Sequence, residues 1–340
     1  MNNLQTVAPP RTWCTPHEHY LAVLDSPWYR TVVELQHAIS VATTAFWTTR
    51  NALTVNLPIT TGSISSPMGL GSDSTPVKVD LEGIPTYLAD SMQFMLEYGC
   101  RLAPEGCYYI MPSFRGEPAD DTHLCQFFHS EAEIPGGLED VISAVEAYVA
   151  FVAARLLDTH ADNIVSAAGS VAHFEAMLER SAFARLTFDE AAALLRNDPT
   201  FIVDHGQWRT MTRAGERQLL ASVDSFIWVT HMDHLSVPFY QAFGDARHKT
   251  AANADLLFGI GEIVGSGERH ATGEDLLAAL ELHRVPPDAY AWYLAMKQRH
   301  PLKTSGFGMG VERFLLWVLQ HDDIRDIPLL LRFNGEEIVA

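Results

Sequence analysis

Apolar and polar positions follow helical spacing in some parts of the chain and strand spacing in others. Residues 28–50 show apolar positions at helical intervals, and a strand-like stretch over residues 53–57 follows and ends at Pro58. This order predicts an amphipathic helix that leads into a strand. The preceding residues contain prolines and show little patterning, so we expect an N-terminal arm over residues 1–25 and one folded domain over residues 26–340.

Two strand-like stretches in the middle of the chain predict an antiparallel hairpin with a long polar tip. They run from Tyr108 to Phe114 and from Leu124 to Ile134, with Gly, Glu, Pro and Asp between them. The hairpin gathers a cation, a carboxylate, an imidazole and an aromatic ring, which are Arg115, Glu117, His123 and Phe127. These groups suit a nucleoside triphosphate, because an arginine fork binds phosphate and an aromatic plane stacks on a base. The aromatic residue could instead be an ordinary buried strand residue.

A second motif lies near the C-terminus. The run Ser305–Arg313 contains three alternate glycines, and the apolar stretch Phe314–Trp317 follows it. The pattern predicts a glycine-lined segment that enters a buried helix, with Arg313 in the first turn. Backbone N–H groups at a helix N-terminus and a fixed guanidinium form a phosphate site. An ordinary glycine turn before a helix would give the same residues.

The region between these motifs is predominantly helical in pattern. The sequence Pro135-Gly136-Gly137 ends the hairpin and precedes a predicted helix that extends to about Leu157. Residues 160–225 predict two further helices. One of them begins at Thr187, which can cap it, and Glu190 stands at the capping-box position.

Together the two motifs resemble motifs 2 and 3 of the class II aminoacyl-tRNA synthetases, in particular the aspartyl and asparaginyl subgroup. Further segments extend the resemblance over nearly the whole chain: Leu88–Gln93 as the Ser-x-Gln segment, Pro238–Tyr240 and Ala254–Leu257 as later strands, Gly261–Arg269 as the substrate strand, and Ala289–Leu294 as the helix ahead of motif 3. The resemblance implies an α+β fold of the class II synthetase type, with a mixed, mostly antiparallel sheet flanked by helices. It also implies a homodimer built on motif 1, which corresponds to the first predicted helix and strand.

The resemblance assigns the nucleotide contacts. It implies that Arg115 contacts the α-phosphate of ATP and Glu117 the adenine amino group. It implies that Phe127 stacks on adenine, while His123 and Arg313 hold the outer phosphates. Arg115 and Arg313 would therefore be the catalytic residues, because adenylation mainly requires orientation and neutralisation of charge on phosphorus.

The resemblance also implies a metal ion. Asp255 and Glu262 match the metal-binding carboxylates of the family. Carboxylate oxygens that bridge to ATP phosphates suit Mg²⁺. Without the resemblance, two acidic residues in strands would be interpreted as solvent-facing.

Five further positions bear on the amino-acid substrate. By resemblance, Gln93 and Glu131 receive the α-amino group, and Arg269 reads the carbonyl or carboxylate of the side chain. Leu96 stands where aspartyl enzymes have lysine, and Glu97 stands where asparaginyl enzymes have glutamate. A carboxylate accepts a hydrogen bond from an amide but repels a second carboxylate, which favours an asparaginyl-like pocket. The alternative is that this glutamate is an exposed helical residue.

Several departures from the family pattern bear on tRNA. Thr122 replaces the arginine that usually precedes the histidine of the motif 2 loop, and Gln126 replaces a glutamate. The formal net charge is −19, from 23 basic and 42 acidic residues, and we find no cluster of Lys and Arg. A protein that grips a polyanion usually carries a basic face, so a tRNA partner is disfavoured. Glu268 and His270 beside the substrate arginine also depart from the pattern and leave the side-chain specificity open.

The composition is that of a globular protein, with 47% hydrophobic and 19% charged residues. We find no signal peptide and no apolar run long enough to span a membrane. The four cysteines show no CxxC spacing, which indicates reduced thiols in a cytoplasmic protein. Because motif 1 begins near residue 30, we expect no room for the anticodon-binding barrel of the subgroup.

Three functions are compatible with these residues. The first is an ATP-dependent ligase that adenylates aspartate, asparagine or a close analogue and transfers the acyl group to ammonia or a small amine without tRNA, as asparagine synthetases of the ammonia-using type do. The second is a free-standing enzyme that transfers the aminoacyl group to tRNA, a carrier or a protein. The third is an inactive regulatory paralogue, which the retained ATP and metal residues disfavour.

Overall fold

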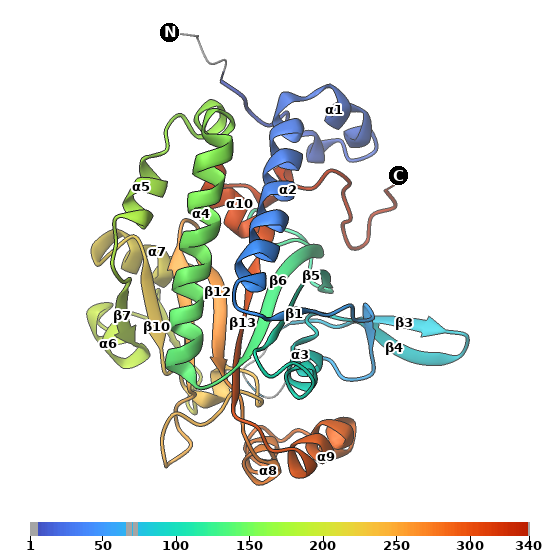
Figure 1. Cartoon of the computed structure of the whole chain (residues 1–340), viewed down its shortest axis with the longest axis vertical. Helices are drawn as coiled ribbons and strands as arrows, with labels where there is room; N and C mark the ends of the chain where they lie inside the picture. Colours follow the sequence, from blue (N-terminus) through green and yellow to red (C-terminus); the bar gives the residue numbers. More distant parts are fainter. Residues whose placement is uncertain (1–5, 66–69, 71–73, 339–340) are drawn as a thin grey trace.

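The computed structural model describes residues 6–65, 70 and 74–338 of the 340-residue chain. In this described part, the centre of the fold is an eight-stranded sheet (Figure 1). Its strands are, in spatial order, β1 (Leu53–Thr54), β5 (Cys107–Phe114), β6 (Gln126–Pro135), β13 (Thr304–Gly310), β12 (Gly261–Glu268), β11 (Asn253–Phe258), β10 (Ile227–Thr230) and β7 (Ala184–Thr187). Only the outermost pairs, β1 with β5 and β10 with β7, are parallel, and the other pairs are antiparallel. The expected mixed and mostly antiparallel sheet is therefore confirmed.

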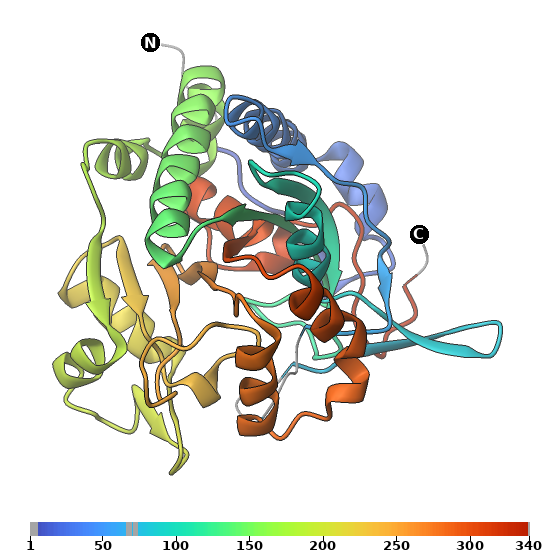
Figure 2. The same ribbon diagram turned by 60° about the horizontal axis from the view of Figure 1, so that its bottom comes forward.

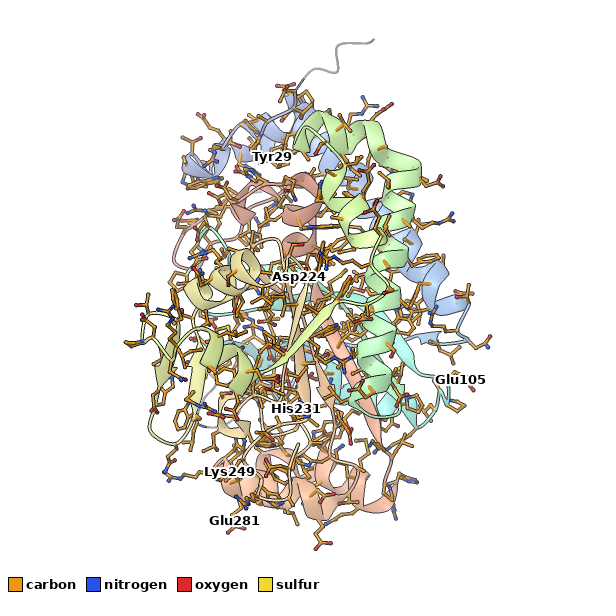
Figure 3. All side chains as sticks on the ribbon, turned by 90° about the vertical axis from the view of Figure 1, so that its left-hand side faces the viewer. Tyr29, Glu105, Asp224, His231, Lys249 and Glu281 are labelled. Carbon is orange, nitrogen blue, oxygen red and sulfur yellow. The ribbon has the colours of Figure 1, made fainter. Side chains whose placement is uncertain are left out.

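Three helices build the largest hydrophobic core with this sheet: α2 (Pro27–Thr48), α4 (Leu138–Ala168) and α10 (Val311–Leu319). The first two lie side by side along the molecule (Figure 1). Large rings fill the space between the helices and the sheet, and Trp47 packs within 6.0 Å of Tyr108 and within 6.0 Å of Phe307, measured between ring centroids. Buried Tyr29 of α2 lies towards one end of the molecule, and exposed Glu281 lies at the other (Figure 3).

A second hydrophobic cluster lies where α8 (Gly273–Leu282) and α9 (Ala291–Arg299) come forward in Figure 2. These helices pack against α3 (Gln93–Cys100) and against the loop that carries Phe239 and Tyr240. Phe94 of α3 lies 4.5 Å from Tyr293 of α9, measured between ring centroids. This packing holds α3 and the Phe239–Tyr240 loop together, and both contribute to the lining of a pocket described below.

The remaining elements are short. They are η1 (Thr12–Cys14), α1 (His19–Asp25), β2 (Thr60–Thr61), β3 (Val77–Leu81), β4 (Ile84–Leu88), α5 (Ala172–Leu178), α6 (Phe188–Leu194), β8 (Ile202–Asp204), β9 (Arg209–Met211), α7 (Arg213–Ser222), η2 (His234–Ser236), η3 (Pro287–Tyr290) and η4 (Ile324–Asp326). Strands β3 and β4 form a hairpin that projects from the body of the molecule (Figure 1). Among the described residues, no helix is both long and apolar enough to cross a membrane. The four cysteines form no disulfide.

Local signals in the sequence are confirmed by the structure. Strands β5 and β6 form the predicted hairpin, and β13 leads into α10 with Arg313 in the first turn of the helix. The predicted capping box also forms: the Glu190 N–H donates to Thr187 Oγ1 over 3.2 Å, and the Thr187 N–H donates to Glu190 Oε2 over 2.8 Å. These features depend on residues close together in the chain, which is why the sequence specifies them.

Other expectations were wrong in extent or type. Residues 238–240 form a turn, closed by the Gln241 N–H donating to the Pro238 carbonyl over 3.1 Å, and not a strand. Residues 160–225 contain three separate helices, α5, α6 and α7, and not two. Helix α4 extends beyond Leu157 to Ala168, with a kink at His160. Strand β1 is shorter than the strand expected over residues 53–57. The stretch expected as an arm contains α1, whose buried His19 contacts the Pro328 carbonyl at 2.9 Å; the domain boundary at residue 25 stays a prediction.

We expect different results from alanine substitution at a crowded glycine of β13 and at an uncrowded glycine elsewhere in the chain. A Cβ at Gly306 would overlap the Glu133 carboxylate and lie 2.6 Å from the Ala132 carbonyl oxygen, whereas a Cβ at Gly62 would meet nothing within 4 Å. We expect Gly306→Ala to lower the free energy of unfolding by about 1–3 kcal/mol, because an overpacked site must distort. The matched control, Gly62→Ala, should change it by less than about 0.5 kcal/mol. Urea unfolding followed by circular dichroism measures both, and equal effects would contradict this account of β13.

Candidate active site

Two adjoining hollows of about 280 Å³ and 300 Å³ lie along β6, β12 and β13. We call the first the outer pocket; its lining includes Arg115, His123, Phe127, Ile263, Gly310 and Arg313. We call the second the inner pocket; its lining includes Ser91, Gln93, Glu131, Tyr240, Gln241 and Arg269. Arg115, His129, Glu262 and Gly308 line both pockets, so the two form one continuous space.

The outer pocket carries two half-buried arginine side chains. Arg115 follows β5, and its Nη1 donates to Ser74 Oγ over 2.9 Å, while its buried Nε has no hydrogen-bond partner among the described residues. Its guanidinium carbon lies 5.7 Å from the centre of the half-buried Phe127 ring. Arg313 donates from Nη1 to the Glu262 carbonyl over 2.9 Å. The guanidinium groups are thus anchored on one side, and the unpaired Nε leaves a buried donor for a ligand.

His123 is held as a neutral ring between arginines. Its Nε2 lies 2.9 Å from Arg313 Nη2, and its Nδ1 lies 3.1 Å from Asp120 Oδ1. Arg213 of α7 contacts the same ring at Nδ1, over 2.5 Å. Burial, followed by the two arginines, lowers the pKa of His123. Two arginines therefore flank this ring, and a pair of cations at one spot suits a polyanion.

Glu117 stands apart from this group. It does not belong to the lining of the outer pocket, and its carbonyl accepts a hydrogen bond from Asn334 Nδ2 over 3.0 Å. Its Oε2 is buried and has no hydrogen-bond partner within the described ranges. A buried acceptor without a donor suits an exocyclic amino group, so the expected adenine contact stays a prediction.

Three acidic side chains meet below the outer pocket. A Cβ at Gly265 would lie 3.0 Å from Glu262 Oε1 and 3.7 Å from Asp255 Oδ1, so both carboxylates converge over this glycine of β12. Glu216 of α7 accepts the Glu262 N–H over 3.2 Å. Burial, together with the charges of Glu262 and Glu216, raises the pKa of Asp255.

This acidic group fits the expected divalent cation. Carboxylates gathered at one spot repel one another, and a hard cation with oxygen ligands would offset that repulsion. No three His, Cys, Asp or Glu side chains in the described part of the chain are close enough to hold a metal by themselves. An ion here would therefore take some of its ligands from phosphate oxygens or water.

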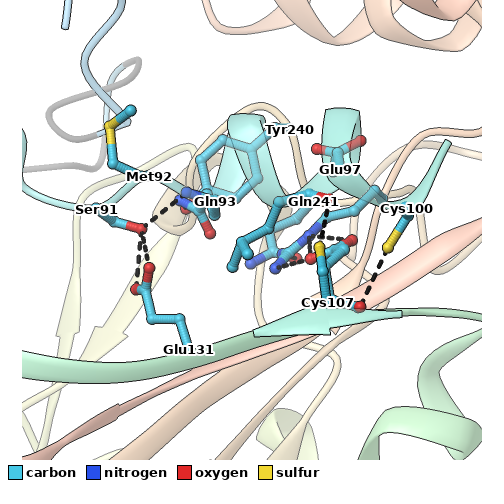
Figure 4. A network of polar contacts seen from close by, with 12 residues as sticks. Ser91, Met92, Gln93, Glu97, Cys100, Cys107, Glu131, Tyr240 and Gln241 are labelled. Carbon is cyan, nitrogen blue, oxygen red and sulfur yellow. Dashed lines mark hydrogen bonds and ion pairs between the residues drawn. The ribbon is translucent and has the colours of Figure 1, made fainter. Parts of the chain in front are cut away.

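The inner pocket ends at a buried carboxylate on β6. Glu131 accepts hydrogen bonds from Ser91 Oγ over 2.9 and 2.7 Å (Figure 4). It accepts another from the Tyr109 hydroxyl. Burial raises the pKa of Glu131 to about 7. Gln93 lies beside it and donates from Nε2 to the Tyr240 hydroxyl. Among the described residues, no lysine or arginine donates a hydrogen bond to this carboxylate, so an ammonium group would complete it.

The other end of the inner pocket carries a buried ion pair. Arg269 is 2% exposed and donates from Nε and Nη2 to Glu133, whose exposure is 0%. Its Nη1 donates to Gln241 Oε1 over 3.0 Å. The Tyr240 ring covers the guanidinium, with 5.4 Å between the guanidinium carbon and the ring centre. Arg269 therefore faces the pocket with its charge already matched.

The expected direct contact between Glu97 and the substrate is not what the structure shows. Glu97 is fully buried and does not line the inner pocket; its Oε2 accepts from Lys297 Nζ over 2.5 Å and its Oε1 from the Tyr293 hydroxyl. In Figure 4 its carboxylate points away from Ser91 and Glu131. The alternative of an exposed helical glutamate is also wrong. Lys297 lies 200 residues further along the chain, so no local sequence pattern could predict this ion pair.

The structure thus brings Arg115, His123, Phe127, Arg313, Gln93, Glu131, Arg269, Asp255 and Glu262 to the two pockets and places Glu97 and Glu117 outside their linings. Sequence reasoning missed Arg213, Glu216 and Gln241. The first two come from α7, a helix without a recognisable motif. Gln241 directly follows the Pro238–Tyr240 segment and could have drawn notice as a polar residue after an aromatic one.

The chain is similar to known proteins over most of its length. The family model of the class II tRNA synthetases (D, K and N) matches residues 15–332. A probable cytoplasmic asparagine–tRNA ligase of Encephalitozoon cuniculi is 32% identical over 267 residues, which are 76% of this chain and 58% of that protein. The chain therefore spans under two thirds of the length of that relative.

Solved structures share the fold. The asparaginyl-tRNA synthetase from Pyrococcus horikoshii complexed with asparaginyl-adenylate superimposes with a TM-score of 0.85 at 24% identity, covering 98% of this chain and 74% of that one. The aspartyl-tRNA synthetase from Entamoeba histolytica gives a TM-score of 0.75 at 19% identity, covering 95% of this chain and 62% of that one. At these identities the likeness shows the fold alone.

The acidic group predicts a pH dependence of stability. Burial, followed by the charge of Glu262, raises the pKa of Glu216 to about 7 from 4.5. Since its folded-state pKa is raised, the stability of the neutral form is fully present below about pH 4.5 and is lost as pH rises through 7. We expect Glu216→Gln to raise the free energy of unfolding by about 1–2 kcal/mol at pH 8 and to change it little at pH 5.

Urea unfolding at the two pH values, without divalent cations, measures this difference. Glu281→Gln is the matched control, because Glu281 is an exposed glutamate on α8 and should give the same small effect at both pH values. An effect of Glu216→Gln that does not grow with pH would show that burial and the acidic neighbours do not raise the pKa of Glu216.

Proposed function

The chain belongs to the class II tRNA synthetases of the D, K and N subgroup, and from this membership we propose that it uses ATP to adenylate asparagine, aspartate or a close analogue. One observation carries the proposal: two pockets of opposite character meet at Arg115. The outer pocket offers arginines and an aromatic ring, which suit ATP. The inner pocket offers an unneutralised buried carboxylate, which suits an α-amino group.

The proposed reaction needs little covalent help from the protein. A carboxylate oxygen of the amino acid forms a bond to the α-phosphorus, the bond from that phosphorus to the bridging oxygen breaks, and pyrophosphate leaves. Both Arg115 and Arg313 would stabilise the charge that develops on the phosphate oxygens. Glu131 would hold the ammonium group and thereby aim the carboxylate at phosphorus. Mg²⁺ held by Asp255, Glu262 and phosphate oxygens would supply further charge neutralisation when bound.

The choice of amino acid is supported from two sides. The charge of Arg269 is matched by Glu133, which disfavours a second carboxylate in the pocket and favours an amide. The relative from Encephalitozoon cuniculi is named as an asparagine–tRNA ligase. We therefore propose asparagine or another amide-bearing amino acid ahead of aspartate.

The acceptor is the less constrained part of the proposal. The net charge of −19 and the hairpin tip favour ammonia or a small amine over tRNA. At that tip Thr122 binds back to Asp120 Oδ1 over 3.0 Å, and Asp120 pairs with Arg213 at 3.2 Å, so the loop is tied to the protein itself. The name of the curated relative favours tRNA as the second candidate.

We also propose a cytoplasmic homodimer formed through α2 and β1, the segments that correspond to motif 1. Strand β1 is an edge of the eight-stranded sheet, and its Leu53 is 55% exposed. Helix α2 exposes Val33 and Val41 on its outer surface. An open strand edge beside exposed apolar side chains favours a second copy of the chain.

Loss of either arginine should abolish adenylation. We expect Arg115→Ala and Arg313→Ala each to lower amino-acid-dependent ATP–pyrophosphate exchange by at least about 100-fold, because each removes a preorganised positive charge from the phosphates. Arg185→Ala is the matched control, since Arg185 pairs with Glu139 at 2.8 Å on the surface and lines neither pocket. Exchange that persists in a folded Arg115 or Arg313 variant would refute the nucleotide site.

The acceptor is decided by product analysis. Purified protein is incubated with ATP, Mg²⁺ and labelled asparagine, and then receives ammonium, hydroxylamine or total tRNA. We expect an amide or hydroxamate to form at the same rate with and without ribonuclease treatment. Label that appears on tRNA and disappears with ribonuclease would establish the second candidate instead.

A further inference from the structure

Gln241 occupies the side-chain end of the inner pocket, although neither the sequence motifs nor the mechanism above assigns it a role. It follows Tyr240 and is 8% exposed. Its backbone is held on both sides, because its N–H donates to Pro238 and its carbonyl oxygen lies 2.9 Å from the ring nitrogen Nε2 of buried His234. A bridge pairs it with Arg269 in the antiparallel sense. Its position in the pocket is therefore fixed by the fold.

The orientation of its amide follows from hydrogen-bond chemistry. A guanidinium group only donates, so the contact of 3.0 Å with Arg269 Nη1 requires the amide oxygen of Gln241 on that side. The NH₂ group must then point the other way. It makes no hydrogen bond within the described part of the chain. Strand β12 leaves room for this arrangement, because a Cβ at Gly267 would overlap Gln241 Oε1.

The surrounding charges are already matched. Glu133 pairs with Arg269 at 3.2 Å, and Glu97 pairs with Lys297 behind the pocket at 2.5 Å. A carboxylate side chain would add an unmatched buried charge here, whereas a carboxamide needs only hydrogen bonds. The group presented to a substrate side chain is thus a neutral donor, the Gln241 NH₂.

We propose that Gln241 determines specificity: its NH₂ group donates a hydrogen bond to the side-chain carbonyl oxygen of an amide-bearing amino acid, while its Oε1 withholds one Arg269 N–H from the pocket. The inference rests on the proposed adenylation. It differs from the contact expected from the resemblance, in which Arg269 itself reads this oxygen. Arg269 acts through Gln241 and sets the direction of the amide.

Two substitutions separate the two ends of this amide. Gln241→Glu keeps an oxygen for Arg269 but replaces the NH₂ donor with a second oxygen. We expect KM for asparagine in ATP–pyrophosphate exchange to rise about 10- to 100-fold with kcat changed by less than about threefold, because a buried pair is left unmade. Gln241→Met also loses the donor but releases Arg269 Nη1, so the ratio of kcat/KM for aspartate to that for asparagine should rise at least about tenfold.

Gln218→Glu is the matched control, since Gln218 is an exposed residue of α7, and it should leave both substrates unchanged. Circular dichroism and the thermal midpoint of each variant show whether the fold survives. An unchanged KM for asparagine in folded Gln241→Glu would overturn the inference. So would a fall in kcat at constant KM, which indicates a structural role.

Failure of the proposed function has a different signature. Wild-type protein without exchange on either amino acid refutes adenylation, and the inference is then judged by calorimetric titration of L-asparagine and L-aspartate. Asparagine that binds more tightly than aspartate, with the preference lost in Gln241→Met, supports the role of Gln241. Equal binding of the two amino acids, or no binding of either, overturns it.

Discussion

The burial of two carboxylates on β6 is the constraint on which the candidate site depends. Glu131 and Glu133 are 4% and 0% exposed, and a buried carboxylate is stable only with room, hydrogen bonds and a matching charge. Arg269 supplies the charge for Glu133, while hydroxyl groups supply hydrogen bonds to Glu131. Removing one partner of such a buried pair costs about 3–5 kcal/mol. The side chains that line the pocket therefore also stabilise the central sheet, so a substitution at Glu131, Glu133 or their partners should lower the stability of the protein as well as change the site.

The glycines of β13 are explained by the same constraint. Their alternation predicted a glycine-lined segment beside a phosphate site, but β13 pairs with β6 so that Gly306 stands opposite Glu133 and Gly308 opposite Glu131. A Cβ at Gly308 would lie 2.8 Å from Glu131 Oε1, and one at Gly306 would overlap the other carboxylate. Only Gly310, where the nearest atom would be 3.7 Å away on Arg313, leaves space towards the outer pocket. Two of the three glycines thus make room for the protein's own acids.

The sequence predicted contacts between residues close together in the chain and missed contacts between residues far apart in it. The capping box joins Thr187 to Glu190, and the hairpin joins neighbouring strands, so local pattern was sufficient for both. Pairing of the acidic side chains depends on residues far apart: Lys297 reaches Glu97 across 200 positions, and Glu216 reaches Glu262 from a helix without a motif. The resemblance to a family placed single residues in the site. It could not reveal which partners would occupy them, because those partners are set by tertiary packing.

The charged groups of the two pockets that lack an oppositely charged partner indicate which charges a ligand should carry. At the side-chain end, Arg269 is paired and the exposed group is a neutral amide. At the other end, the hydrogen bonds to Glu131 come from the hydroxyls of Ser91 and Tyr109, and burial raises its pKa to about 7, so an incoming ammonium would stabilise the carboxylate form. The Nε of Arg115, at the junction of the pockets, is a buried donor without a partner in the described ranges. These charges fit the proposed amino-acid substrate, with an ammonium group at Glu131, an anionic group near Arg115 and an uncharged side chain at the Arg269 end.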